Sequence, residues 1–249
     1  MVSGGGGTGA GGRRLGAVTA EEFVLAATEP GAVPFVPEIT LRMAADPFGL
    51  WERTEVEWAG REWPAGGIAD IASGRATALP PPFWAFPWAG GQGLARYVLD
   101  NPGTVAGRAV LDMASGSGLV AIAAAKAGAA RVTATDIDPL ALSAVRVNAA
   151  ANHVAVTVRS RDVRAGGGGG EAPEVVLVAD AFYERDLAEQ TLALLRRAED
   201  GGARVMLADP GRAFLPTSEL TAIAEYEIPV VAALENADSK RVTVYGLRC

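Results

Sequence analysis

From residue 90 onward, short apolar segments alternate with longer segments of mixed polarity, and this alternation limits which folds the chain can adopt. Such a pattern is typical of a parallel sheet with helices on both faces. The apolar runs predict strands at 109–113, 132–136, 154–159, 175–179 and 204–208. The other segments predict helices at 91–99, 119–127, 139–151, 184–198 and 217–225.

The pattern changes after the fifth predicted strand. Two β-rich runs, 226–234 and 241–247, are joined by residues 235–238. They predict a closing antiparallel hairpin in the place where a dinucleotide-binding fold has its second nucleotide half. The expected fold class is therefore α/β, a Rossmann-like doubly wound sheet of seven strands, mostly parallel with a C-terminal antiparallel hairpin.

The chain is expected to divide into three parts. Residues 1–17 are rich in glycine and predict a disordered tail. Residues 18–82 predict a helical and irregular N-terminal extension that lies as a cap against the main domain, residues 83–249.

Local signals within the extension differ in strength. Thr19 and Glu22 have the spacing of a capping box at the start of a helix. The segment 37–45 fits a helix or a strand equally well. Residues 46–82 contain three tryptophans and many Gly and Pro residues, which predicts an irregular segment.

Composition excludes several classes of function. The formal net charge of −7 and the isoelectric point near 4.9 argue against nucleic acid as a partner, since that binding depends on Lys and Arg neutralising phosphates. Cys249 is the only cysteine and His153 the only histidine, so we expect neither a disulfide within the chain nor a metal site. Neither a membrane-spanning run nor a signal peptide is apparent, which predicts a cytoplasmic protein with no membrane partner.

The first candidate ligand site is the turn that follows the first predicted strand. The strand leads through Asp112 and Ala114 to Gly116 and Gly118, and a helix starts directly afterwards. Ligands on such sheets bind beyond the carboxyl ends of the strands, and glycines let backbone approach a ligand closely. The glycines alone also fit an ordinary tight turn.

The second candidate is the acid that ends the next strand. Asp136 follows Gly116 by 20 positions, where a carboxylate accepts hydrogen bonds from the ribose hydroxyls of an adenosine ligand. Asp138 precedes Pro139 and is expected to cap the following helix. Both features fit NAD as well as S-adenosylmethionine.

Three features favour S-adenosylmethionine over NAD. Asp112 would repel a pyrophosphate but tolerates the ammonium group of a methionine moiety. The C-terminal hairpin replaces a second nucleotide half. Asp162 follows the third strand, where it can accept a hydrogen bond from an adenine amino group or remain a solvated loop residue.

A third group of residues predicts the place of a methyl acceptor. The fourth strand ends in Ala179-Asp180-Ala181-Phe182-Tyr183. An acid can orient an incoming amine, and aromatic walls exclude water, which favours the neutral amine that methyl transfer needs. Trp88 offers an aromatic face to a sulfonium cofactor, and Trp84 does so less convincingly. Asp209 is expected to shape the turn into Pro210 and Gly211.

Together these residues resemble class I S-adenosylmethionine-dependent methyltransferases, and within them the seven-β-strand lysine methyltransferases, which carry an Asp-x-x-Tyr motif after the fourth strand. The chain is similar to the electron transfer flavoprotein β-subunit lysine methyltransferase family and its bacterial relatives over about residues 23–247. The supporting stretches are VPEITLR (36–42), PFWA (82–85), WAGGQ (88–92), DIDP (136–139), DAFY (180–183) and DPGR (209–212).

The resemblance implies roles for individual residues. Asp180 and Tyr183 would receive the lysine side chain. Ala114 stands where the family has a glycine, and the tract 51–79 is longer than in the family, which leaves the choice of substrate open. The residues expected to form the cofactor pocket are Trp88, Gly90, Asp112, Ala114, Gly116, Gly118, Asp136, Ile137, Asp162 and Ala179.

Four functions therefore stand in order. The first is a protein lysine N-methyltransferase acting on the electron transfer flavoprotein β subunit. The second is a small-molecule N-methyltransferase with a nicotinamide-like substrate, which would need a closed pocket over Tyr183 in place of an open groove. An NAD-dependent oxidoreductase and a non-catalytic methyltransferase-like module follow.

Overall fold

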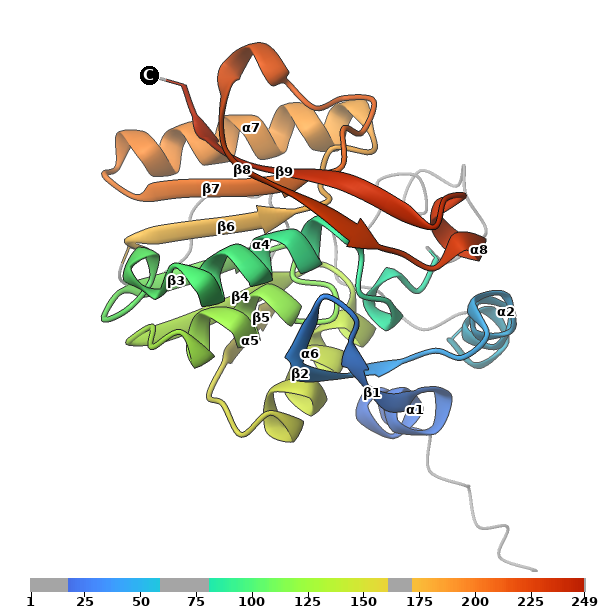
Figure 1. Ribbon diagram of the computed structural model, residues 1–249. Coiled ribbons are helices and arrows are strands. Elements are labelled where there is room, and N and C mark those ends of the chain that lie inside the picture. The colour runs from blue at the N-terminus through green and yellow to red at the C-terminus, as the bar shows by residue number, and fades with distance from the viewer. Residues whose placement is uncertain (1–17, 59–80, 161–171, 249) are drawn as a thin grey trace, which may run out of the picture.

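The computed structural model describes residues 18–58, 81–160 and 172–248 (Figure 1). A seven-stranded sheet has the strand order β5-β4-β3-β6-β7-β9-β8. β3 to β7 pair in parallel, whereas β9 pairs antiparallel with both β7 and β8, so the predicted fold class is confirmed. The strands are β3 Ala109–Met113, β4 Arg131–Asp136, β5 Thr157–Ser160, β6 Val175–Ala179, β7 Arg204–Asp209, β8 Leu220–Pro229 and β9 Ser239–Leu247.

Helices cover both faces of this sheet (Figure 1). Alternate side chains of a strand point to opposite faces. Val176 and Leu207 therefore pack toward α7, whereas Leu177 and Met206 belong to the core under α4 and α5. The helices are α4 Ala89–Asp100, α5 Leu119–Lys126, α6 Pro139–Ala151 and α7 Arg185–Asp200.

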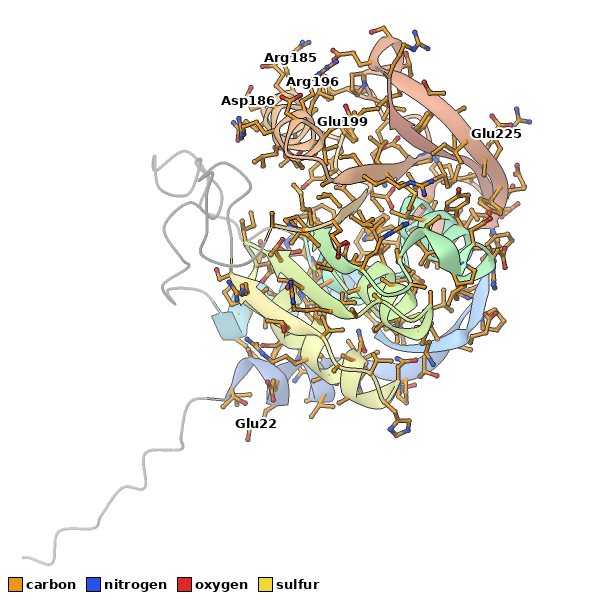
Figure 2. The ribbon with its side chains drawn as sticks, turned by 90° about the vertical axis from the view of Figure 1, so that its left-hand side faces the viewer. Glu22, Arg185, Asp186, Arg196, Glu199 and Glu225 are labelled. Carbon is orange, nitrogen blue, oxygen red and sulfur yellow. The ribbon has the colours of Figure 1, made fainter. Side chains whose placement is uncertain are left out.

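The sequence of α7 shows why this helix lies on the surface. Ala188 and Leu195 are buried against the sheet. Figure 2 shows Arg185, Asp186 and Arg196 on the outer side of the same helix. An apolar stripe with charged residues opposite is the pattern of a helix with one buried face.

The N-terminal extension contains more regular structure than predicted. The capping box at the start of α1 (Ala20–Ala27) is confirmed, with Thr19 and Glu22 each accepting a hydrogen bond from the other's backbone N–H. β1 (Glu29–Val33) and β2 (Val36–Met43) form an antiparallel hairpin, so the ambiguous segment 37–45 is mainly a strand.

The prediction of irregular structure at 46–82 is wrong for its first part, which forms α2 (Pro47–Trp58). Leu50 and Thr54, one helical turn apart, are both buried, and the Thr54 hydroxyl donates to the Leu50 carbonyl at 2.8 Å. Tertiary packing of these positions outweighs the scattered apolar pattern. The rest of that tract, the glycine-rich tail and the loop 166–170 lie outside the described residues, and the division into three parts stays a prediction.

Two asparagines of α6 attach the hairpin to the main sheet domain. Asn148 is fully buried, and its side chain accepts from the Arg42 amide at 2.8 Å and donates to the Ser117 carbonyl at 2.8 Å. Asn152 accepts from the Thr40 amide at 3.1 Å and donates to the Thr40 carbonyl. The extension therefore lies against the helix that begins at the candidate ribose site.

The helix predicted at 217–225 is wrong. Only Thr217–Glu219 forms a short 3-10 turn, and the chain then enters β8. Leu220 and Ile228 are buried while Glu225 and Glu227 are exposed, so the burial of these residues follows the two-residue period of a strand. The predicted run 226–234 ends as a strand at Pro229 and is followed by the single helical turn α8 (Ala232–Glu235).

The strand predicted at 154–159 begins later, at Thr157. His153 has φ 56°, and the Val154 amide donates to the Ala149 carbonyl at 3.1 Å. These residues therefore still terminate α6. No helix in the described ranges is long and apolar enough to cross a membrane.

Candidate functional site

The turn between β3 and α5 adopts the left-handed backbone that its glycines allow. Ala114, Gly116 and Gly118 have φ values of 51°, 51° and 82°. A Cβ on Gly118 would lie 3.2 Å from both methyl carbons of Val145, so this position needs glycine for space as well as for conformation. Ala114 adopts the left-handed conformation despite its Cβ, at a cost of about 1–2 kcal/mol. The departure from the family glycine is thus accommodated without a different turn.

Asp112 lies under this turn. Its side chain is buried, and Oδ2 accepts from the Ala121 amide at 3.0 Å in the first turn of α5. The Ser115 hydroxyl donates to the Asp112 carbonyl at 3.0 Å. Burial raises the pKa of Asp112 to about 7, despite these hydrogen bonds, and the charge of Asp136 adds to the rise. A cationic ligand group beside this carboxylate would favour its ionised form.

Asp136 joins the ends of β3 and β4. Its Oδ2 accepts from the Gly116 amide at 2.9 Å, and its Oδ1 accepts from the Asp138 amide at 3.0 Å. Burial raises the pKa of Asp136, while hydrogen bonds from backbone amides oppose the rise. The cap predicted for Asp138 is confirmed, since its Oδ1 accepts from the Leu140 amide at 2.7 Å. Asp136 is therefore fixed at the carboxyl edge of the sheet, directly beside the glycine turn.

Asp180 is the corresponding acid after β6. Its backbone has φ 56°, and its Oδ2 accepts from the Gly91 amide of α4 at 2.9 Å. Its Oδ1 accepts from Arg212 Nη2 at 2.8 Å and from Nε at 3.2 Å. Burial raises the pKa of Asp180, and Arg212 opposes the rise. Its hydrogen bonds thus lead to α4 and to the loop after β7, whereas Glu184 occupies the cap position of α7.

Arg212 is a member of this site that sequence reasoning included only as part of a resembling stretch. β7 ends at Asp209, whose Oδ1 accepts from the Gly211 amide at 2.8 Å and from the Arg212 amide at 2.6 Å. Asp209 therefore shapes this turn, as predicted. The signal that could have identified Arg212 is its place just after a strand end, beside the end that carries Asp180.

Aromatic side chains line the opening beside Asp180. The Phe83 ring lies 5.7 Å from the rings of both Trp88 and Tyr183. The Trp88 indole N–H donates to the Phe83 carbonyl at 2.7 Å, and the Arg212 guanidinium lies 5.9 Å from the Trp88 ring centre. Burial raises the pKa of Tyr183 to about 12, so its phenol keeps its proton at neutral pH. Trp84, by contrast, is buried in the core with Leu140.

Gly90 allows α4 to approach the strand ends. A Cβ at this position would lie 2.6 Å from Asp180 Oδ2 and 2.8 Å from the Ala208 carbonyl oxygen. Neither distance is possible without movement of the acid or of β7. Gly90 thus has a demonstrable packing role, whereas its predicted role in lining the cofactor pocket stays a prediction.

The shared carboxyl edge brings most of the predicted residues together. Ile137 and Ala179 lie in it beside Asp136 and Asp180. Asp162 lies outside the described residues. Within the described ranges, no group of three or more His, Cys, Asp and Glu side chains could hold a metal ion.

Comparison with known proteins assigns the chain to a family. A family model for ribosomal protein L11 methyltransferase matches residues 97–183. The electron transfer flavoprotein β-subunit lysine methyltransferase of Xenopus laevis is 34% identical over 241 residues, covering 94% of this chain and 86% of that protein. The Danio rerio protein of the same name is 31% identical over 235 residues, covering 92% and 83%. The chain belongs to this family.

A solved structure agrees with the fold of the methyltransferase. A proposed RNA methyltransferase from Pyrococcus horikoshii has a TM-score of 0.52 and 14% identity, and the match covers 68% of this chain and 88% of that one. At this identity the likeness shows the fold alone. The methyl donor of the methyltransferase is S-adenosylmethionine.

The residues at the carboxyl edge fit this cofactor. The carboxylate of Asp136 provides acceptors for a ribose diol, because each of its oxygens accepts only one backbone N–H among the hydrogen bonds found. The backbone at Gly116 is open, since a Cβ there would have no atom nearer than the Trp84 Cα at 4.0 Å. Asp112 supplies a buried negative charge for an ammonium group.

The close approach at Gly90 can be tested against its neighbour. Gly90→Ala should lower the free energy of unfolding of the methyltransferase by roughly 1–3 kcal/mol, because the added carbon forces Asp180 or β7 to move. Gly91→Ala is the matched control. Its Cβ would meet only Leu119 Cδ2 at 3.7 Å, an ordinary contact. Chemical denaturation of both variants measures the difference, and equal losses would show that the packing at Gly90 is looser than described.

Proposed function

We propose that the protein is an S-adenosylmethionine-dependent lysine N-methyltransferase whose substrate is the electron transfer flavoprotein β subunit. The observation that carries the proposal is Asp180, a buried carboxylate fixed by the Gly91 amide and Arg212 at the ligand edge of the sheet, beside the exposed ring of Tyr183. The substrate follows the printed names of the relatives, which cover most of the chain.

We assign the cofactor to the carboxyl ends of β3 and β4. Asp136 would accept hydrogen bonds from both ribose hydroxyls, and Asp112 would face the ammonium of the methionine moiety. Trp88 offers its ring to the sulfonium, with Gly90 beside it. The sequence prediction that Asp162 binds the adenine amino group belongs to the same proposal, as do the supporting positions Ala114, Gly116, Gly118, Ile137 and Ala179.

The cofactor supplies a methyl group bound to a positively charged sulfur. The protein must hold the acceptor nitrogen in line with that group and keep the nitrogen unprotonated. Asp180 would orient the amine by accepting a hydrogen bond from it. Tyr183 would shield the amine from water, and its raised pKa keeps the phenol neutral and available as a hydrogen-bond donor.

Exposure of the aromatic opening favours a protein side chain over a free small molecule. Phe83 is 39% exposed and Tyr183 is 42% exposed in the described part of the chain. A long lysine side chain can enter such an opening while its own protein stays outside. The antiparallel pairing of β9 with β7 occupies the place of a second nucleotide half, which argues against an NAD-dependent oxidoreductase. The cytoplasmic location stays a prediction.

The substrate assignment predicts a clear preference. Incubation with labelled S-adenosylmethionine should methylate lysine on the electron transfer flavoprotein β subunit and should leave free nicotinamide unmodified. Mass spectrometry of the flavoprotein and chromatography of nicotinamide measure both outcomes. Turnover of nicotinamide without transfer to the flavoprotein would instead favour the small-molecule function.

The cofactor assignment predicts different effects for two neighbouring acids. Asp136→Ala should weaken S-adenosylmethionine binding at least about tenfold, because hydrogen bonds to a charged group are worth about 1.5–3 kcal/mol. Asp138→Ala should lower stability by about 1 kcal/mol through loss of a helix cap but leave the affinity nearly unchanged. Calorimetric titration of both variants decides, and similar affinities for the two would contradict the ribose role of Asp136.

The acceptor assignment predicts a loss of rate without a loss of cofactor. Asp180→Ala should leave S-adenosylmethionine affinity nearly unchanged and reduce the methylation rate by roughly a hundredfold or more. Asp180→Asn keeps the shape of the side chain and controls for unfolding. Tyr183→Phe should cost less, because its ring remains. Affinity, melting temperature and initial rate are measured on each preparation, and a folded Asp180→Ala variant with a near-normal rate would contradict the assignment.

A further inference from the structure

Resting on the proposed function, we infer that Arg212 is a positioning residue for methyl transfer. Its guanidinium group pairs with Asp180 so that the incoming lysine amine meets a nearly neutral ion pair in place of a bare carboxylate. A bare carboxylate in a buried site would hold the lysine as an ammonium ion, which has no lone pair to accept a methyl group. Arg212 would therefore favour the reactive form of the acceptor.

The hydrogen bonds at Asp180 divide its two oxygens between different partners. Both Arg212 donors reach Oδ1, at 2.8 and 3.2 Å. Oδ2 accepts from the Gly91 amide at 2.9 Å and keeps a second lone pair. An amine can use that lone pair without displacing the guanidinium group. The pair is thus arranged as a neutralised hydrogen-bond acceptor.

Arg212 is held in this place from several directions. The carboxylate of Asp209, which is fully buried, accepts the Arg212 backbone N–H at 2.6 Å and fixes the turn. The Trp88 ring faces the guanidinium group at 5.9 Å. Glu235 Oε1 lies 3.9 Å from Arg212 Nη2 and has no hydrogen-bond partner, although its side chain is only 7% exposed. Such restraint fits a fixed charge better than a mobile surface arginine.

The charges around the acceptor position explain why the loss of Arg212 should matter. Asp180 follows β6, Asp209 ends β7 and Glu235 ends α8, so three carboxylates face the guanidinium group. Lys240 of β9 pairs with Glu235 Oε2 at 3.8 Å, on the other oxygen. Tyr183 stays neutral at physiological pH. Removing Arg212 therefore leaves an excess of negative charge, which stabilises a lysine ammonium.

The transfer step itself is balanced without a further reactant. The lysine ammonium first releases one proton to solvent. The lone pair of the neutral amine then forms the new nitrogen–carbon bond as the carbon–sulfur bond breaks, and the bonding electrons remain on sulfur. The product is a methylated ammonium and a neutral thioether. Arg212 acts only on the first of these steps, by favouring the neutral amine.

The test is the pH dependence of methylation for Arg212→Gln, with Arg212→Lys as the variant that keeps the charge. At pH 7.5 the Gln variant should lose about tenfold or more in kcat, and the loss should shrink as the pH rises toward 10. Its KM for the protein substrate should not increase, because the lysine ammonium replaces the guanidinium as the partner of Asp180. The Lys variant should keep the wild-type pH profile.

Arg196→Gln is the matched control for loss of one positive charge. Arg196 pairs with Glu219 just before β8, whose first residue, Leu220, pairs with Leu247 at the far end of the strands from the site. Its kcat and pH profile should equal those of the wild type. An Arg212→Gln loss of equal size at every pH would overturn the inference, and so would a faster rate at pH 7.5, which would make Arg212 an inhibitory plug.

A second readout separates this inference from the proposed function. Carbon-13 NMR of labelled aspartate carboxyls follows Asp180 without any substrate, with Asp180→Asn to assign the signal. The pKa of Asp180 should rise in Arg212→Gln and stay near the wild-type value in Arg212→Lys. An unchanged value would overturn the inference even if the flavoprotein is methylated. If the pKa rises but no protein lysine is methylated by the wild type, the proposed function fails and the ion pair stands.

Discussion

The structure depends on one constraint, the need to satisfy a buried carboxylate at the end of β6. Asp180 takes a left-handed backbone conformation, and its two oxygens are bonded to α4 through the Gly91 amide and to the loop after β7 through Arg212. An unpaired charge in this position would be strongly destabilising. Gly90 has no side chain because the acid and the Ala208 carbonyl occupy that space.

The same principle operates on the other half of the sheet. Asp136 accepts from the Gly116 amide and so ties the end of β4 to the turn after β3. Each acid thus closes a junction between neighbouring elements and keeps a free lone pair toward the ligand edge. The assigned roles, ribose for one acid and lysine amine for the other, use groups that the fold already holds rigidly. Preorganisation of this kind is what methyl transfer requires from a protein.

Local patterns predicted those elements in which propensity and burial agree. β3 and β6 match their predicted bounds, as does α6, whose Asp138 cap was readable from the sequence. The segment 217–225 was wrong because its strand character comes from pairing with β9, a contact with distant residues. Asp136 and Asp180 were identifiable because they end apolar strands. The role of Arg212 was not, since it arises only when the ends of β6 and β7 lie side by side.

The most direct test of the account is a crystal structure of the methyltransferase with S-adenosylhomocysteine and a lysine peptide from the electron transfer flavoprotein β subunit. The quantity to measure is the distance from the lysine nitrogen to Asp180 Oδ2. The account predicts about 3 Å, with Arg212 still on Oδ1 and the ribose on Asp136. A lysine nitrogen that reaches the cofactor sulfur along a path away from Asp180 would contradict it.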